Sequence, residues 1–260
     1  MITSPQNPKI QWVRALLEKR KQRDAEQAFV VEGVRLVEEA QLSGWQPQIV
    51  LYDERLSERG QALVRGFAQA GVETVEIPSR LMESVAGTDS PQGLLAVLPQ
   101  REPVLPSMLN FVLVADNIRD PGNLGTLLRT AAAAGAQAAL LSPGTTDAYA
   151  PKVLRSGMGA HFRLPVLHLD WEAIHLTCAR HSLQVYIAEA MEGRVCWDLD
   201  LTNPLALIIG SEAEGASAEA SALAQQAITI PMPGRFESLN AAVAASILLF
   251  EVVRQRRAAG

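Results

Sequence analysis

Residues 117–136 read NIRDPGNLGTLLRTAAAAGA, and they follow the apolar run FVLVA at 111–115. An apolar run before a turn that carries glycine and asparagine predicts a buried strand. The leucine- and alanine-rich stretch after the turn predicts a helix. In open α/β sheets, ligands bind at the carboxyl ends of the strands. We therefore expect the NIRDPGNLG loop to line a functional site, with an arginine on the helix that follows it.

The pattern around this junction repeats along both halves of the chain. In the second half, helical stretches separate predicted strands, and a long helix is predicted from about 240 to 257; the strands are FVLVA, AALL, RLPVL, QVYIA, LALIIG and AITI. In the first half, helical stretches again separate the predicted strands FVVEG, IVLY, TVEI and LLAVL. This alternation predicts an α/β fold, with a mostly parallel sheet in each half.

A proline-rich segment divides the two halves. The stretch PQREPVLPS contains Pro99, Pro103 and Pro106 and is typical of a linker. It predicts a smaller N-terminal α/β domain at 1–100, a linker at 101–107 and a second domain at 108–260.

Composition narrows the class of protein. The start of the chain, MITSPQNPKIQ, shows no apolar segment typical of a signal peptide, and no apolar run is long enough to predict a membrane span. The 2 cysteines lack the spacing typical of a zinc site, so we expect no metal, and a reducing cytoplasm fits them best. The net charge of −5 argues against a generally basic surface but leaves room for a local basic patch.

Such a patch is present at the N-terminus. Within residues 1–23 only Glu18 opposes a run of basic residues, which are Lys9, Arg14, Lys19, Arg20, Lys21 and Arg23. The charges are typical either of a solvated helix face or of contacts with nucleic-acid phosphates.

Three polar, glycine-bearing loops follow predicted strands of the second half. They are NIRDPGNLG after FVLVA, GSEAEGAS after LALII, and PMPGRFESLN after AITI. The sequence contains neither GxGxxG nor GxxxxGK[ST], which argues against a nucleotide-dependent oxidoreductase and a P-loop enzyme. The acidic middle loop suits a cationic or zwitterionic ligand better than a phosphate. Taken singly, each polar residue also has a structural interpretation, such as helix capping by Ser238 and Asn240.

Together, the three loops resemble the ordered motifs of the SpoU (TrmH-like) family of RNA 2′-O-ribose methyltransferases, in the knotted SPOUT class. The resemblance rests on NIRDPGNLGTLLRTAAAAGA, LALIIGSEAEGAS and ITIPMPGRFESLNAAVAASILLFE. The first half resembles the substrate-binding domain of many members, through SPQNPKIQWVRALLEKRK, FVVEGVRLVEEA and TDSPQGLLAVL.

The resemblance implies an α/β-knot with a deep trefoil near the C-terminus, S-adenosyl-L-methionine as cofactor, and a homodimer. It implies that the cofactor is lined by Gly210, Ile230 and Leu239, with Met232 as a weaker addition. It also implies that the apolar face of the last helix is partly dimer surface.

The catalytic residues that the resemblance implies are Asn123, Arg129, Glu212, Ser238 and Asn240. The implied reaction is methyl transfer to a ribose 2′-hydroxyl, and 23S ribosomal RNA is the favoured substrate. The basic N-terminal residues would bind RNA phosphates. A tRNA target and a catalytically inactive RNA-binding protein of the same fold are the alternatives. Ala213 and Ala216 depart mildly from the family pattern. A guanidinium stays protonated at neutral pH, so Arg129 is better suited to orient a phosphate or ribose than to act as a simple base.

Overall fold

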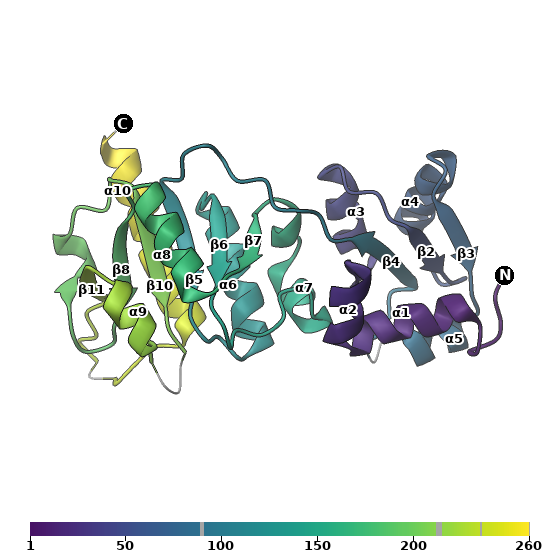
Figure 1. The fold of residues 1–260 in the computed structure, drawn as a ribbon. Helices are drawn as coiled ribbons and strands as arrows, with labels where there is room; N and C mark the ends of the chain where they lie inside the picture. The colour runs from purple at the N-terminus through teal and green to yellow at the C-terminus, as the bar shows by residue number, and fades with distance from the viewer. Residues whose placement is uncertain (89–90, 212–214, 235, 260) are drawn as a thin grey trace. The chain divides into compact units, whose positions relative to one another are not determined.

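The computed structural model describes residues 1–88, 91–211, 215–234 and 236–259. The chain forms two compact units (Figure 1). Unit 1 comprises Met1–Glu102 with Tyr149–Phe162, and unit 2 comprises Pro103–Ala148 with Arg163–Gly260. Within the described residues, no helix is both long and apolar enough to cross a membrane.

Unit 2 contains a 7-stranded sheet in which all the strand pairs are parallel, as the sequence predicted. In spatial order the strands are β7 (Val166–His168), β6 (Ala138–Leu141), β5 (Phe111–Ala115), β10 (Leu205–Ile209), β8 (Gln184–Ala188), β11 (Gln226–Thr229) and β9 (Arg194–Val195). The helical elements are α6 (Pro121–Ala133), α8 (Trp171–Arg180), η2 (Cys196–Asp198), α9 (Ala218–Leu223) and α10 (Ala241–Ala259).

The centre of this sheet explains the apolar runs of the sequence. Every residue of β5 and of its neighbour β10 is buried, as expected for parallel strands covered on both faces. Because β5, β10, β8 and β11 are consecutive and parallel, their carboxyl ends meet at one edge of the sheet. The three loops singled out in the sequence leave from that edge.

The start of α6 shows how the sequence shapes one of these loops. Asn117 has a positive φ of 53°, which asparagine tolerates better than most residues. Asp120 then caps α6, because its carboxylate accepts a hydrogen bond from the backbone N–H of Asn123 at 2.8 Å. Pro121 occupies the first helical turn, where its missing N–H costs nothing.

Unit 1 contains a 4-stranded sheet in the order β1 (Ala28–Glu32), β4 (Leu94–Pro99), β2 (Ile49–Tyr52) and β3 (Glu73–Glu76). Its helical elements are α1 (Pro8–Glu18), α2 (Arg20–Glu26), α3 (Val34–Leu42), α4 (Glu58–Gln69), α5 (Ser79–Val85), α7 (Pro151–Gly157) and η1 (Ala160–Phe162).

The prediction of a mostly parallel sheet in the first half was wrong. Only β2 and β3 are parallel, whereas β4 runs antiparallel to both β1 and β2. The chain therefore enters β4 at the end of the sheet where β3 finishes, so the connection through α5 does not cross back. The buried face of α5 packs instead in one apolar cluster with α1. Alternation of strands and helices alone does not reveal such a reversal.

The segment Tyr149–Phe162 lies between β6 and β7 in the chain, yet it belongs to unit 1. The ring of Tyr149 lies 4.7 Å from that of Phe29, and the ring of Phe162 lies 5.5 Å from that of Trp45. No local sequence pattern assigns this segment to the first unit. The boundaries drawn at the proline-rich linker stay a prediction.

Arg23 does not fit the predicted set of RNA-contacting residues. The basic stretch does not form one continuous helix, because α1 and α2 are separated at Lys19, which has an extended backbone. Arg23 is 4% exposed, and its guanidinium donates hydrogen bonds to the carbonyl oxygens of Leu16 and Leu17 at the end of α1. Its charge satisfies backbone carbonyls inside the protein, which gives it a structural role.

Candidate cofactor and active site

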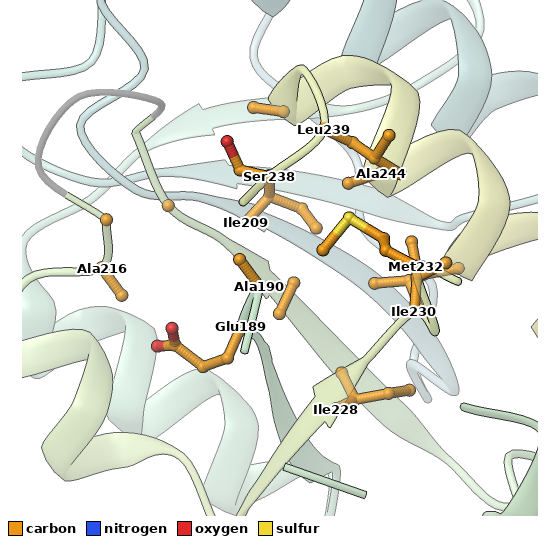
Figure 2. Close-up of a pocket in the computed structure, with 15 residues that line it drawn as sticks. Glu189, Ala190, Ile209, Ala216, Ile228, Ile230, Met232, Ser238, Leu239 and Ala244 are labelled. Atoms are coloured by element: carbon orange, nitrogen blue, oxygen red, sulfur yellow. The ribbon is translucent and has the colours of Figure 1, made fainter. Parts of the chain in front are cut away.

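A pocket lies where the carboxyl ends of β8, β10 and β11 meet the start of α10 (Figure 2). All the predicted cofactor residues lie in its wall, namely Gly210, Ile230, Met232 and Leu239. Ser238, predicted to be catalytic, lines it too. The structure therefore brings residues from two of the three motifs to one cavity, although their individual roles stay predictions.

Most of the remaining wall is apolar. Ile209, Ile228 and Leu248 contribute aliphatic side chains, while Glu189 is the one ionisable residue among the described residues of the lining. Sequence reasoning missed Glu189, because the EAMEG stretch after QVYIA carries no motif. The available signal was positional: Glu189 directly follows β8, at the same edge of the sheet as the three loops.

Gly210 is fixed as glycine by the loop that follows it. A Cβ atom at this position would lie 2.7 Å from backbone atoms of Gly215 and Ala216, closer than real Cβ atoms come. The loop is closed by backbone hydrogen bonds between Ser211 and Gly215 in both directions, at 2.9 and 3.0 Å. Glu212, predicted to be catalytic, lies outside the described residues.

The first and third motifs meet through two asparagines. The side-chain Nδ2 of Asn240 donates a hydrogen bond to Oδ1 of Asn123 at 3.1 Å. Oδ1 of Asn240 accepts hydrogen bonds from the backbone N–H groups of Ala242 and Val243 at the start of α10. Asn240 thus caps a helix and holds Asn123, which confirms the structural interpretation of this residue, while its catalytic role stays a prediction.

Arg129 lies farther along α6 and is exposed. It forms no hydrogen bond or ion pair with another described residue, and the same is true of the Ser238 hydroxyl. The structure does not bring the Arg129 guanidinium into a hydrogen bond with the asparagine pair.

Helices α6 and α10 lie side by side and run parallel. Near the starts of the two helices, Asn123 and Asn240 are hydrogen-bonded. Farther along both helices, the hydroxyls of Thr130 and Ser246 form a second hydrogen bond of 3.1 Å. Arg129 stands one residue before Thr130, and Ile247 stands one residue after Ser246. The two helices turn in the same sense along the chain, and Thr130 and Ser246 face each other. One residue back on α6 and one residue forward on α10 therefore turn to the same side of the helix pair. Arg129 and Ile247 therefore share one exposed surface.

That surface is apolar on α10. Val243, Ile247 and Phe250 are spaced at helical intervals and are 48%, 36% and 48% exposed. Such a row of large apolar side chains on one helix is typical of a surface that another protein covers.

Comparison with known proteins identifies this arrangement. Residues 110–250 match the model of the SpoU rRNA Methylase family, and residues 7–96 match the model of the MRM3-like substrate binding domain. The chain belongs to the SpoU rRNA methylase family. The predicted family and its α/β methyltransferase fold are confirmed, while the trefoil knot stays a prediction.

Relatives cover nearly the whole chain. The 23S rRNA (guanosine(2553)-2′-O)-methyltransferase RlmP of Bacillus subtilis is 33% identical, over 96% of this chain and 98% of its own. The crystal structure of the SpoU methyltransferase AviRb from Streptomyces viridochromogenes, in complex with the cofactor AdoMet, matches with a TM-score of 0.86 and 31% identity. It covers 98% of this chain and 100% of its own. The cofactor of the family, S-adenosylmethionine, is thereby confirmed.

A tRNA-modifying relative matches less of the chain. The A. aeolicus TrmH/SpoU tRNA modifying enzyme has a TM-score of 0.52 and 27% identity, and it covers 59% of this chain and 78% of its own.

The residues of the pocket fit S-adenosylmethionine. Aliphatic side chains such as Ile230 and Leu239 offer a flat apolar surface to an adenine ring. Gly210 and Gly215 bring the backbone of the tight turn into the wall, and Glu189 adds a carboxylate. When bound, the cofactor supplies the methyl group. Among the described residues no group of histidine, cysteine and acidic side chains is arranged to hold a metal ion.

The tight turn at Gly210 yields a first prediction. In Gly210→Ala the new methyl group must push the 215–216 backbone, at a cost of ~1–3 kcal/mol. We expect the affinity for S-adenosylhomocysteine, measured by titration calorimetry, to fall by about 5- to 150-fold. The control is Gly66→Ala, because a Cβ there lies 3.6 Å from a flexible glutamine side chain. Equal affinity in wild type and Gly210→Ala would show that this turn does not shape the cofactor site.

Proposed function

We propose that this protein is an S-adenosylmethionine-dependent methyltransferase that methylates a ribose 2′-hydroxyl in 23S ribosomal RNA. The observation that carries the proposal is the hydrogen bond between Asn123 and Asn240, beside a pocket lined by Leu239 and the other predicted cofactor residues. It joins the first and third family motifs at the place where a methyl group would be transferred. Relatives named as rRNA 2′-O-methyltransferases support the reaction.

In the proposed reaction, this chain aligns a weak nucleophile. The asparagine pair orients the ribose, and the exposed guanidinium of Arg129 binds the neighbouring phosphate through charge-assisted hydrogen bonds. Alignment of the 2′-hydroxyl with the methyl group supplies much of the rate. A role for Glu212, outside the described residues, stays part of the proposal.

Coverage favours ribosomal RNA over tRNA. RlmP, named for an rRNA target, matches 96% of this chain, whereas the A. aeolicus tRNA modifying enzyme matches 59%. The match to the relative that is named for an rRNA target thus extends over unit 1 as well as unit 2. We place the enzyme in the cytoplasm, which suits its free cysteines, Cys178 and Cys196.

The basic N-terminal residues of unit 1 are the proposed RNA contacts. Lys19 and Lys21 are exposed at the break between α1 and α2. Lys9 pairs with Glu73, Arg20 with Asp24, and Arg14 donates to Ser84. Exposed ion pairs contribute little, so the paired side chains remain available to phosphates.

The proposed assembly is a homodimer that covers the apolar row on α10. Arg129 shares the exposed side of the helix pair with Ile247, so the second subunit would lie next to the predicted catalytic arginine.

Arg129→Ala tests the proposed reaction. With labelled S-adenosylmethionine and unmodified 23S ribosomal RNA, we expect the rate of methyl transfer to fall by about 100-fold or more, because the guanidinium that orients the RNA is lost. Cofactor affinity and melting temperature should stay at wild-type values. The control is Arg180→Ala, another exposed helical arginine. A wild-type rate in Arg129→Ala would refute the assignment, and labelling of tRNA alone would replace the proposed substrate.

The double variant Lys19→Ala/Lys21→Ala tests the RNA contacts. Each phosphate contact that is lost should reduce the slope of log K against log salt concentration by about 0.7–0.9. RNA binding is measured by fluorescence anisotropy across a salt titration. Arg65→Ala/Arg80→Ala removes the same charge from exposed positions on other helices of unit 1. If both double variants change the slope equally, the effect belongs to net charge and the proposed patch is wrong.

Ile247→Glu tests the dimer. A carboxylate in the centre of the apolar row would be buried without a partner, so we expect the dissociation constant of the dimer to rise by more than about 100-fold. Sedimentation equilibrium gives the constant. Leu176→Glu provides the control, because Leu176 is an exposed apolar residue on α8, away from the row. A dimer equally stable in both variants would place the interface elsewhere.

A further inference from the structure

Glu189 has an unusual position in the cofactor pocket. Its backbone N–H donates a 2.9 Å hydrogen bond to the carbonyl oxygen of Ile228, so the sheet fixes the backbone that carries it. Its side chain extends along the Ala216 side of the pocket, away from Ser238 and Leu239 (Figure 2).

The carboxylate of Glu189 lacks a partner in the described structure. It is partly buried, and it forms no hydrogen bond or ion pair with another described residue. Its neighbours in the wall are small or aliphatic, including Ala190, Ala216 and Ile228. The carboxylate oxygens still reach solvent in this structure. A ligand that covered them without offering a hydrogen bond would bind at a cost, and a ligand that supplies hydrogen-bond donors at this place would avoid that cost.

We propose that Glu189 binds the ribose of the cofactor, with its carboxylate accepting hydrogen bonds from the 2′- and 3′-hydroxyls. The inference rests on the assignment of the pocket to S-adenosylmethionine. The two oxygens of a carboxylate match a pair of neighbouring hydroxyls, and acidic residues bind ribose in this way in other α/β folds.

The arrangement of the pocket favours the ribose over the other donors of the cofactor. The aliphatic wall takes the adenine. The methyl group must face the side of Ser238, which is a predicted catalytic residue, and Glu189 lies away from that side. The carboxylate therefore recognises a part of the ligand that methyl transfer leaves unchanged. It follows that Glu189 should contribute equally to the binding of S-adenosylmethionine and S-adenosylhomocysteine.

The test compares ligands that differ only in the ribose hydroxyls. Titration calorimetry measures the affinities of wild type and Glu189→Ala for S-adenosylhomocysteine, for its 2′-deoxy and 3′-deoxy analogues, and for the cationic ligands S-adenosylmethionine and sinefungin. Wild type should prefer the full ribose, whereas Glu189→Ala should bind S-adenosylhomocysteine about 10- to 100-fold more weakly and lose that preference. Glu189→Gln, which keeps one acceptor oxygen, should be intermediate.

Two controls separate ligand recognition from a structural role. Glu192→Gln removes an exposed carboxylate from the same turn and should leave every affinity unchanged. The melting temperature of ligand-free Glu189→Ala should not fall, because no described residue depends on the carboxylate for a hydrogen bond.

Three results would overturn the inference. The first is an equal preference for the full ribose in wild type and Glu189→Ala. The second is a loss confined to the cationic ligands S-adenosylmethionine and sinefungin, which would assign the carboxylate to positive charge. The third is a wild type that binds none of these ligands, and this alone would also refute the cofactor assignment of the pocket.

Discussion

The site depends on a buried carboxylate that joins distant parts of the chain. Asp116, which directly follows β5, is 1% exposed. It accepts a hydrogen bond from the backbone N–H of Ser217 at 2.7 Å and another from the Ser142 hydroxyl at 2.9 Å. Ser217 in turn caps α9. The loop that contains the tight turn at Gly210 is therefore anchored at both ends, by β10 and by Asp116. Because a buried donor without its acceptor is costly, this anchor holds the pocket wall close to the first motif.

The sequence predicted the features that local patterns encode. The strands of unit 2 are runs of buried aliphatic residues, and the loops at their carboxyl ends carry glycine, proline and asparagine in family order. The features it missed depend on contacts between distant segments. The antiparallel direction of β4 accompanies the packing of α5 against α1, and the burial of Arg23 accompanies the break at Lys19. Glu189 follows a strand that carries no motif, and it lines the pocket because β8 lies between β10 and β11 in the sheet.

The segment Tyr149–Phe162 shows the same dependence at the level of whole units. Tyr149, Leu154 and Phe162 belong to the apolar cluster of unit 1, together with Phe29 and Trp45. The chain therefore leaves unit 2 after Ala148 and returns to it at Arg163. Residues 1–102 alone lack part of their own core, so the proposed RNA-binding unit is completed by chain from between β6 and β7. A substitution in this aromatic cluster would change the packing of a segment that is covalently joined at both ends to unit 2, the methyltransferase unit.

The chemistry available at the site favours positioning over proton abstraction. The predicted catalytic residues that the structure describes are Asn123, Ser238 and Asn240, which are neutral, and Arg129, whose guanidinium stays protonated at neutral pH. None of these groups is suited to act as a simple base at neutral pH. Glu189, the carboxylate in the described pocket wall, lies on the side away from Ser238. In the proposed reaction, the rate therefore comes from holding the 2′-hydroxyl in line with the methyl group. This explains why so much of the structure, from Asp116 to the parallel pair of α6 and α10, serves to fix loops relative to one another.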